Sequence, residues 1–304
     1  MKIPNDNLVI LIGSPRGNAL VWKTLDKYVL KEQNADLAIC FTDNYDKNEY
    51  SKLKQLAKYD WSIKDYNNWE TYYRENYSSN ILKFFDDFKD NAISGGLNEA
   101  PGAGAILLAQ RDTIFRKHLT KVKNYNQIIL TRSDYLYIDK HPQLNNSYIW
   151  IPDGEDFGGI NDRYWVFSSE IAEKVLGICD YLDKTRFKRN SIINENLEGL
   201  LLTYLKDIGI LKKVNRFNYF HFLVKTENDA TKHSPGEFKI RLLGKVSVKY
   251  VSEFKRALTN VDFKNNIRKF NPTNLIIYIN FLIYAKFFKK RIDIKIYKRV
   301  FNEK

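Results

Sequence analysis

The fold is decided near the N-terminus by the stretch LVILIGSPRG, Leu8–Gly17. Its first half is an unbroken apolar run, which predicts a strand buried on both faces, as in a parallel sheet. The run stops at a turn rich in Gly, Ser and Pro, and a helical pattern follows from Ala19 to Glu32. A second apolar run, Asp36–Phe41, completes a strand–helix–strand unit with an expected right-handed crossover.

The same alternation continues along the chain. Further apolar runs predict strands at 127–130, 148–152 and 164–167, with one more strand inside 213–225. Helices are predicted at 105–118, 168–181 and 194–207, and mostly helical cover over 47–91. We therefore predict an α/β fold with a Rossmann-type mixed, mainly parallel sheet flanked by helices.

Charge separates the C-terminal region from the rest of the chain. Residues 232–304 carry 18 Lys/Arg and 5 Asp/Glu, which accounts for the whole formal net charge of +13. We predict a boundary near residue 230, with a catalytic domain over 1–230 and a basic, mainly helical appendage over 231–304. Within it, Phe281–Phe301 alternates apolar and cationic residues, which is typical of segments that lie at anionic membrane surfaces.

Several classes of protein are disfavoured. Cys40 and Cys179 are too few for a disulfide framework or a Cys-based zinc site. No His-Glu-x-x-His or Gly-x-Ser-x-Gly motif occurs, which argues against a zinc hydrolase and an α/β-hydrolase. The N-terminus does not resemble a signal peptide, and the longest apolar stretch, Leu275–Phe288, is shorter than a membrane span. We expect a cytoplasmic protein.

Polar or flexible residues follow four of the predicted strands. These segments are Gly13-Ser14-Pro15-Arg16, Thr42-Asp43, Thr131-Arg132-Ser133-Asp134 and the loop 153–163. Because ligands of open α/β sheets bind outside the carboxyl ends of the strands, the four segments predict one binding edge. Each segment alone is also compatible with an ordinary strand end, since Gly, Ser and Asp are common turn residues.

Two of these segments suit a phosphorylated ligand. The turn after the first strand is neither a Walker loop nor a Gly-x-Gly-x-x-Gly loop. Its backbone amides can still hold a base or a ribose, and Arg16 can bind a phosphate. Asp134 can hold a divalent cation against a diphosphate, and Arg132 can offset either charge. A plain turn and a structural Arg–Asp pair are the alternatives.

The loop 153–163 contains four acids, three glycines and an arginine. The paired glycines Gly158 and Gly159 can let the backbone approach a ligand closely. The acids can serve as a general base or accept hydrogen bonds from sugar hydroxyls. The acids do not have the spacing of a calcium-binding loop.

Four motifs together carry a family resemblance. They are Gly-Ser-x-Arg-Gly with Trp22 nearby, Ala35-Asp36-Leu37, Ile-Leu-Thr-Arg-Ser-Asp-Tyr at 129–135 and Gly-Gly-x-Asn-Asp-Arg at 158–163. Over residues 7–225 the chain resembles bacterial and viral surface-glycan glycosyltransferases of the GT-A fold group. The resemblance implies a nucleotide-sugar-binding catalytic domain over 1–230.

The resemblance also implies roles for individual residues. Asp134 takes the place of the last acid of an Asp-x-Asp motif, while Arg132 stands where the first acid would be, so a divalent cation (Mn²⁺ or Mg²⁺) is expected but not required. His221 is the nearest match to a late metal ligand, beside Asp134. The implied catalytic acids are Asp162, Asp156 and Glu155, with Asp162 as base, or as an acceptor contact if the enzyme retains configuration. The implied nucleotide-sugar contacts are Gly13, Ser14, Arg16, Thr42, Asp43, Gln110, Arg132, Ser133, Asp134, Gly158 and Gly159.

The sequence thus predicts sugar transfer from a UDP- or GDP-sugar to a glycan or lipid-linked glycan, in lipopolysaccharide or capsule synthesis, with peripheral contact to the inner face of the membrane. One alternative is a non-enzymatic protein that binds a membrane surface or nucleic acid through the basic region, although no nucleic-acid module accompanies the charge. The other is a different nucleotide-dependent enzyme, such as a phosphotransferase or a sulfotransferase.

Overall fold

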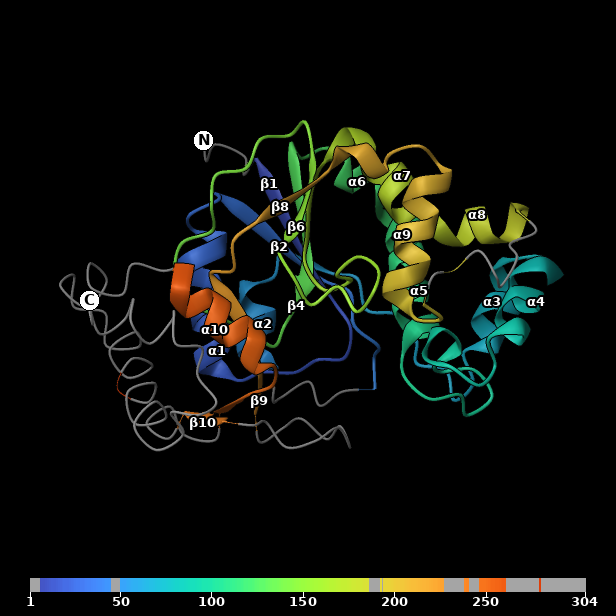
Figure 1. Ribbon diagram of the computed structural model, residues 1–304, viewed down its shortest axis with the longest axis horizontal. Helices are drawn as coiled ribbons and strands as arrows, with labels where there is room; N and C mark the ends of the chain where they lie inside the picture. The colour runs from blue at the N-terminus through green and yellow to red at the C-terminus, as the bar shows by residue number, and fades with distance from the viewer. Residues whose placement is uncertain are drawn as a thin grey trace. The chain divides into compact units, whose positions relative to one another are not determined.

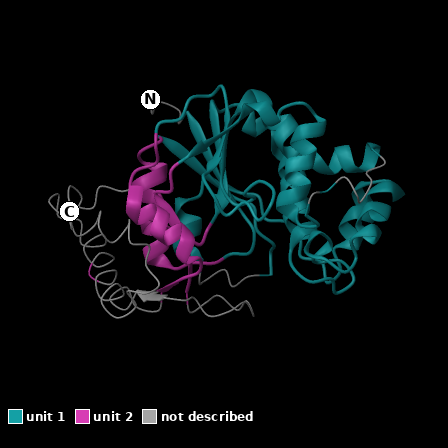
Figure 2. Cartoon of the chain, in the orientation of Figure 1, with its two compact units in different colours: residues 1–15, 34–132, 143–217 teal, residues 16–33, 133–142, 218–304 magenta. Residues whose placement is uncertain are grey.

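The computed structural model describes residues 6–44, 50–185, 192, 194–226, 238–240, 246–260 and 279. The chain divides into two compact units that each combine several stretches of sequence (Figure 2). Unit 1 consists of Met1–Pro15, Asn34–Arg132 and Gln143–Phe217, and unit 2 consists of Arg16–Gln33, Ser133–Pro142 and Asn218–Lys304. The boundary predicted near residue 230 falls outside the described residues and stays a prediction.

Unit 1 is built on a seven-stranded sheet (Figure 1). Its order is β3 (Tyr59–Asp60), β2 (Ala35–Ile39), β1 (Asn7–Ile12), β4 (Gln127–Arg132), β7 (Trp165–Ser168), β6 (Ile149–Pro152) and β8 (Val214–Phe217). The first four strands are parallel, β7 is antiparallel to both of its neighbours, and β6 and β8 are parallel. The predicted α/β fold with a mixed, mainly parallel sheet is confirmed.

The central strands are apolar because both of their faces are buried. β1 is buried from Leu8 to Ile12, and its neighbour β4 is buried from Gln127 to Thr131. β1 pairs with β4 in register from Asn7 opposite Gln127 to Ile12 opposite Arg132. This double burial explains why unbroken apolar runs, rather than alternating ones, identified these strands correctly.

Helices surround this sheet and share its core. They are α2 (Ser51–Leu56), α3 (Glu70–Asn76), α4 (Ser79–Asp87), α5 (Gly104–Thr113), α6 (Leu119–Val122), α7 (Ala172–Leu176), α8 (Ile178–Lys184) and α9 (Leu197–Asp207). α5 continues into η3 (Ile114–His118), so the two together form the helix predicted at 105–118. One hydrophobic cluster joins Ile10 and Ile128 of the sheet to Leu108 of α5 and Leu200 of α9.

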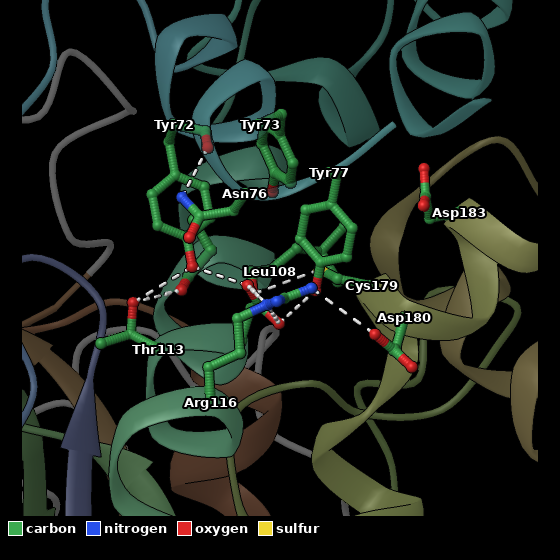
Figure 3. Close-up of polar contacts among 12 residues, drawn as sticks. Tyr72, Tyr73, Asn76, Tyr77, Leu108, Thr113, Arg116, Cys179, Asp180 and Asp183 are labelled. Atoms are coloured by element: carbon green, nitrogen blue, oxygen red, sulfur yellow. Dashed lines mark hydrogen bonds and ion pairs between the residues drawn. The ribbon is translucent and has the colours of Figure 1, made fainter. Parts of the chain in front are cut away.

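A buried polar network ties α3 and α5 together (Figure 3). Asp112 is fully buried, and its carboxylate accepts hydrogen bonds from the hydroxyls of Tyr72, at 2.7 Å, and Tyr77. Arg116 of η3 donates from Nε to the same carboxylate at 3.1 Å and lies 3.5 Å from Asp180 of α8. Because both Asp112 oxygens are used by these partners, we interpret the network as a structural link between helices.

Unit 2 contains an antiparallel sheet in the order β10 (Phe238–Ile240), β11 (Val246–Val248), β9 (His221–Lys225) and β5 (Tyr135–Tyr137). Its helices are α1 (Ala19–Leu25), which continues into η1 (Asp26–Leu30), and α10 (Val251–Asn260). Thr24 of α1 accepts a hydrogen bond from the backbone N–H of Tyr137 at 3.1 Å. Glu253 of α10 accepts one from the backbone N–H of Leu223 at 2.8 Å.

One prediction about secondary structure was wrong. The segment 213–225 holds two strands, β8 and β9, rather than one, and they belong to different sheets. The described part of 231–304 contains strands β10 and β11 besides α10, and the mainly helical character of the whole region stays a prediction. The basic segment 281–301 lies outside the described residues. In the part of the chain that the structure describes, no helix combines the length and the apolar character needed to cross a bilayer.

Candidate functional site

Strand directions bring the predicted segments of unit 1 to one edge of its sheet. β6 is antiparallel to β7 and β7 is antiparallel to β4, so β6 points the same way as β4, β1 and β2. The carboxyl ends of these four strands carry Gly13, Thr42-Asp43, Arg132 and the loop that begins at Asp153. With strands about 4.8 Å apart, the edge from β2 to β6 extends about 19 Å.

Gly13 is held in place by a single buried side chain. The Gln110 side chain of α5 accepts a hydrogen bond from the Gly13 N–H at 2.7 Å and donates one to the Gly13 carbonyl at 3.1 Å. Gln110 is fully buried, and its amide is therefore engaged in fixing the end of β1. Sequence reasoning placed Gln110 among the ligand contacts, whereas the structure gives it a supporting role. Ser14, the next residue along, is exposed.

In unit 2, the segments that follow β1 and β4 in the chain contact each other. The Arg16 N–H donates to the Ser133 hydroxyl at 3.0 Å, and Arg16 Nη1 lies 3.8 Å from a carboxylate oxygen of Asp134. Gly17 has φ +93°, and a Cβ there would lie only 2.7 Å from the Ser133 carbonyl oxygen. A glycine is therefore required for this close approach. Three residues of the predicted site, Arg16, Ser133 and Asp134, are brought together in this way.

The predicted metal ligands Asp134 and His221 have different surroundings. His221 is fully buried, pairs with Tyr137 across the β5–β9 ladder and contacts the Tyr135 ring edge-on, with centroids 4.4 Å apart. Asp134 instead faces Arg16. Among the described residues, no group of three or more His, Cys, Asp or Glu could hold a metal ion.

The end of β2 is braced by the neighbouring loop. Thr42 forms a parallel bridge with Ile63, and its hydroxyl donates to Asn44 at 2.9 Å. The exposed Asp43 accepts a hydrogen bond from the Asp65 N–H at 2.8 Å, and burial together with the Asp43 charge raises the pKa of Asp65. Thr42 and Asp43 therefore stand at the expected edge, where their polar groups also organise the loop.

The loop 153–163 has a well-defined internal structure. Asp156 accepts hydrogen bonds from the Asn161 N–H at 3.0 Å and from Arg216 of β8 at 2.7 Å. Asn161 is fully buried; its side chain donates to the Gly154 carbonyl at 3.2 Å and accepts from the Arg163 N–H at 2.9 Å. These bonds give Asp156, one of the predicted catalytic acids, a structural role in the loop.

The glycine pair of this loop packs on α9. A Cβ on Gly159 would lie 2.1 Å from the carbonyl carbon of Glu198, and one on Gly158 would overlap the side chain of Asn194. The Ile160 N–H donates to the Glu198 carbonyl at 3.0 Å. The side chain of Asn196, the N-cap of α9, accepts a hydrogen bond from the Gly199 N–H at 2.8 Å. The same side-chain amide donates a hydrogen bond to the loop. The structure shows a close approach of Gly158 and Gly159 to protein, and their assignment as ligand contacts stays a prediction.

Asp162, the predicted base, lies between two arginines. Arg111 of α5 donates from Nη2 to the Asp162 carbonyl at 3.0 Å, and Arg163 Nε lies 3.7 Å from the Asp162 carboxylate. Arg111 is 1% exposed and its guanidinium lies 5.0 Å from the centre of the Trp165 ring. Burial lowers the pKa of Arg111 to about 10 and the nearby Asp162 raises it, so the guanidinium stays charged at neutral pH. The backbone carbonyl of Glu155, the remaining predicted acid, accepts a hydrogen bond from the Arg163 side chain at 3.3 Å.

Sequence reasoning missed Glu198, which has the most unusual carboxyl group of this loop region. Burial and the charges of Asp162 and Asp156 raise its pKa, its own backbone N–H and Arg163 lower it, and the net pKa is about 7. The sequence offered one weak signal, an acid in the first turn of a predicted helix. Nothing in the sequence places that helix against a loop some 40 residues earlier.

Comparison with known proteins adds no relative. No model of a known protein family matches the chain, and a search of curated proteins finds no significant match. The family resemblance of the motifs therefore stays a prediction.

Proposed function

We propose that the chain is a glycosyltransferase that moves a sugar from a nucleotide-sugar donor to a glycan or lipid-linked glycan acceptor. The observation that carries this proposal is the polar edge of the unit 1 sheet, where the ends of β1, β2, β4 and β6 lie together. The strand order changes direction between β1 and β4, which is the position where open α/β sheets bind nucleotides. We further propose that the sheet belongs to the GT-A group of folds.

The donor side of the proposed reaction uses the segments after β1 and β4. Gln110 fixes the backbone of the turn after β1 at Gly13, and the chain then leads to Arg16. The Arg16 guanidinium is suited to a diphosphate because it is positively charged, partly exposed and able to donate several hydrogen bonds. The proposal needs no metal held by Asp134 and His221.

The acceptor side uses the loop 153–163. Its carboxylates and arginines lie at the same sheet edge, in an ordered loop rather than on a freely moving one. Carboxylates and guanidinium groups are suitable partners for sugar hydroxyls, and a carboxylate can also remove the proton of the attacking hydroxyl. The bond from the anomeric carbon to the diphosphate breaks as the bond to the acceptor oxygen forms.

Nucleotide binding is the direct test. The protein is titrated with UDP, GDP, CMP and their sugar conjugates, with and without Mn²⁺, and its melting temperature is recorded. At least one nucleotide should raise the melting temperature, because a ligand of the native state stabilises it. Failure of every nucleotide to do so would refute the proposal.

A matched pair of variants locates the binding. Arg16→Gln should weaken nucleotide affinity about tenfold, which corresponds to about 1.4 kcal/mol for one lost charge-assisted contact. Arg74→Gln, in α3, removes an exposed arginine that pairs with Glu70 and should leave the affinity unchanged. Equal effects of the two substitutions would show that the nucleotide responds only to net charge.

A further inference from the structure

Glu198 lies in the first turn of α9, directly against the loop 153–163. Its backbone carbonyl accepts a hydrogen bond from the Ile160 N–H at 3.0 Å. Gly159 packs so closely that any side chain there would overlap the same carbonyl group. Helix and loop are thus fixed against each other, and the Glu198 side chain is close enough to Asp162 and Asp156 to be affected by their charges.

Charged groups of the loop 153–163 act on this carboxyl group. In the loop, Asp162 and Asp156 oppose its ionisation and Arg163 favours it. Arg216 of β8 pairs with Asp156 at 2.7 Å and offsets part of that charge. With burial as the largest cause, the balance raises the pKa of Glu198 to about 7, where a carboxylate can exchange protons near neutral pH.

Arg111 of α5 gives a second, independent indication of a ligand. Its guanidinium is 1% exposed and donates from Nη2 to the Asp162 carbonyl at 3.0 Å. Within the described part of the chain, its Nε and Nη1 atoms have no hydrogen-bond partner. Buried donors are nearly always satisfied in folded proteins, so two donor nitrogen atoms without partners beside this acidic loop indicate a place for the oxygen atoms of a ligand.

Asp112, a fully buried acid of unit 1, shows what a structural carboxylate looks like. Its oxygens accept hydrogen bonds from Tyr72, Tyr77 and Arg116 (Figure 3). By contrast, the causes that shift the pKa of Glu198 include a hydrogen bond from its own backbone N–H but none from a side chain. A carboxylate with this single donor can still accept a proton from a substrate.

We propose that Glu198 is the general base of the site, and that Asp162 is the neighbouring carboxylate that maintains its basicity. The inference rests on the proposed glycosyl transfer. In that reaction the acceptor oxygen bonds to the anomeric carbon and the bond from this carbon to the diphosphate oxygen breaks. The electron pair of the broken bond leaves with the nucleoside diphosphate, and the hydroxyl proton passes to the Glu198 carboxylate.

Three variants of the full chain test this assignment. Glu198→Gln should bind the donor nucleotide as the wild type does, by calorimetry, yet lose about 100-fold or more in the rate of sugar transfer. Asp162→Asn should displace the pH–rate profile of transfer to lower pH, because removing a like charge lowers the pKa of Glu198. Glu195→Gln, an exposed acid just before α9, is the control and should behave as the wild type.

The outcomes separate the base assignment from the function on which it rests. Transfer that persists in Glu198→Gln but falls 100-fold in Asp162→Asn would overturn the assignment and make Asp162 the base, while glycosyl transfer stands. Carboxyl ¹³C NMR gives a readout that needs no substrate: a glutamate signal absent from Glu198→Gln should titrate near pH 7. Titration of that signal near pH 4.5 would overturn the assignment whether or not a donor binds. If the wild type binds no nucleotide, the proposed function fails and this inference with it.

Discussion

Replacing Glu198 by Gln should make the stability of the protein less dependent on pH. Burial and the neighbouring acids move the pKa of this carboxyl group from its ordinary 4.5 to about 7. The folded state therefore tolerates the neutral form better than the charged form. The resulting contribution to stability is fully present below about pH 4.5 and is lost as the pH rises through about 7.

The size of this effect follows from the displacement of the pKa. At about 1.4 kcal/mol for each pKa unit, ionisation of Glu198 costs the folded state about 3 kcal/mol. Solvent reaches this half-buried side chain, and screening reduces the cost to about 1–2 kcal/mol. Glutamine cannot ionise, so Glu198→Gln should gain about 1–2 kcal/mol over the wild type between pH 4.5 and pH 8.5.

Urea unfolding measures this difference directly. The free energy of unfolding of the wild type and of Glu198→Gln is determined at half-unit steps across that pH range, and the two curves are subtracted. Subtraction removes the contribution of every other titrating group that the substitution leaves unchanged. Glu195→Gln serves as a control that should give a flat difference. A flat difference for Glu198→Gln as well would refute the reasoning, because the carboxyl group would then titrate alike in both states.

Three further substitutions, the first with a matched control, test contacts within unit 1. Gly159→Ala places a Cβ 2.1 Å from backbone atoms of α9 and should lower the free energy of unfolding by about 1–3 kcal/mol, measured by thermal denaturation. Gly209→Ala is the control: at φ +73° with no atom within 4 Å of the added Cβ, it should lower the free energy of unfolding by about 1 kcal/mol from backbone strain alone. Asp112→Asn should lower the free energy of unfolding in urea by about 2–4 kcal/mol, because a buried charged acceptor is removed; a loss under 1 kcal/mol would show that the network is dispensable. Gln110→Leu leaves the N–H and carbonyl of Gly13 without partners and should cost about 2–3 kcal/mol, and an unchanged melting temperature would contradict this.

Strands that are buried on both faces could be read from the sequence. The apolar runs at 8–12 and 127–130 correspond to β1 and β4, the central pair of the large sheet. Parallel strands share one carboxyl edge, so the segments after β1, β2 and β4 could be placed together without a structure. The loop 153–163 joins this edge only because β7 reverses direction between β4 and β6, and that pairing depends on long-range contacts.

Short strands and tertiary contacts could not be predicted in this way. β5 has only three residues, Tyr135–Tyr137, which is too short for a periodic pattern. β8 and β9 are separated by three residues, and nothing in their composition assigns them to different sheets. Gln110 acquires its role from a contact with a residue 97 positions earlier in the sequence. Glu198 acquires its role from a loop about 40 positions earlier.

The interleaving of the two units has a consequence for synthesis of the chain on the ribosome. β1 is complete at residue 12, but its partner β4 emerges only after residue 132, more than a hundred residues later. β5 cannot pair until β9, which ends at Lys225, has been synthesised. α10, whose Glu253 binds β9, emerges later still. Such distant pairings close large loops and slow folding. We expect nascent chains to stay open to proteases and chaperones until nearly the whole described sequence has emerged, and truncation before α10 to leave β9 without its helical partner.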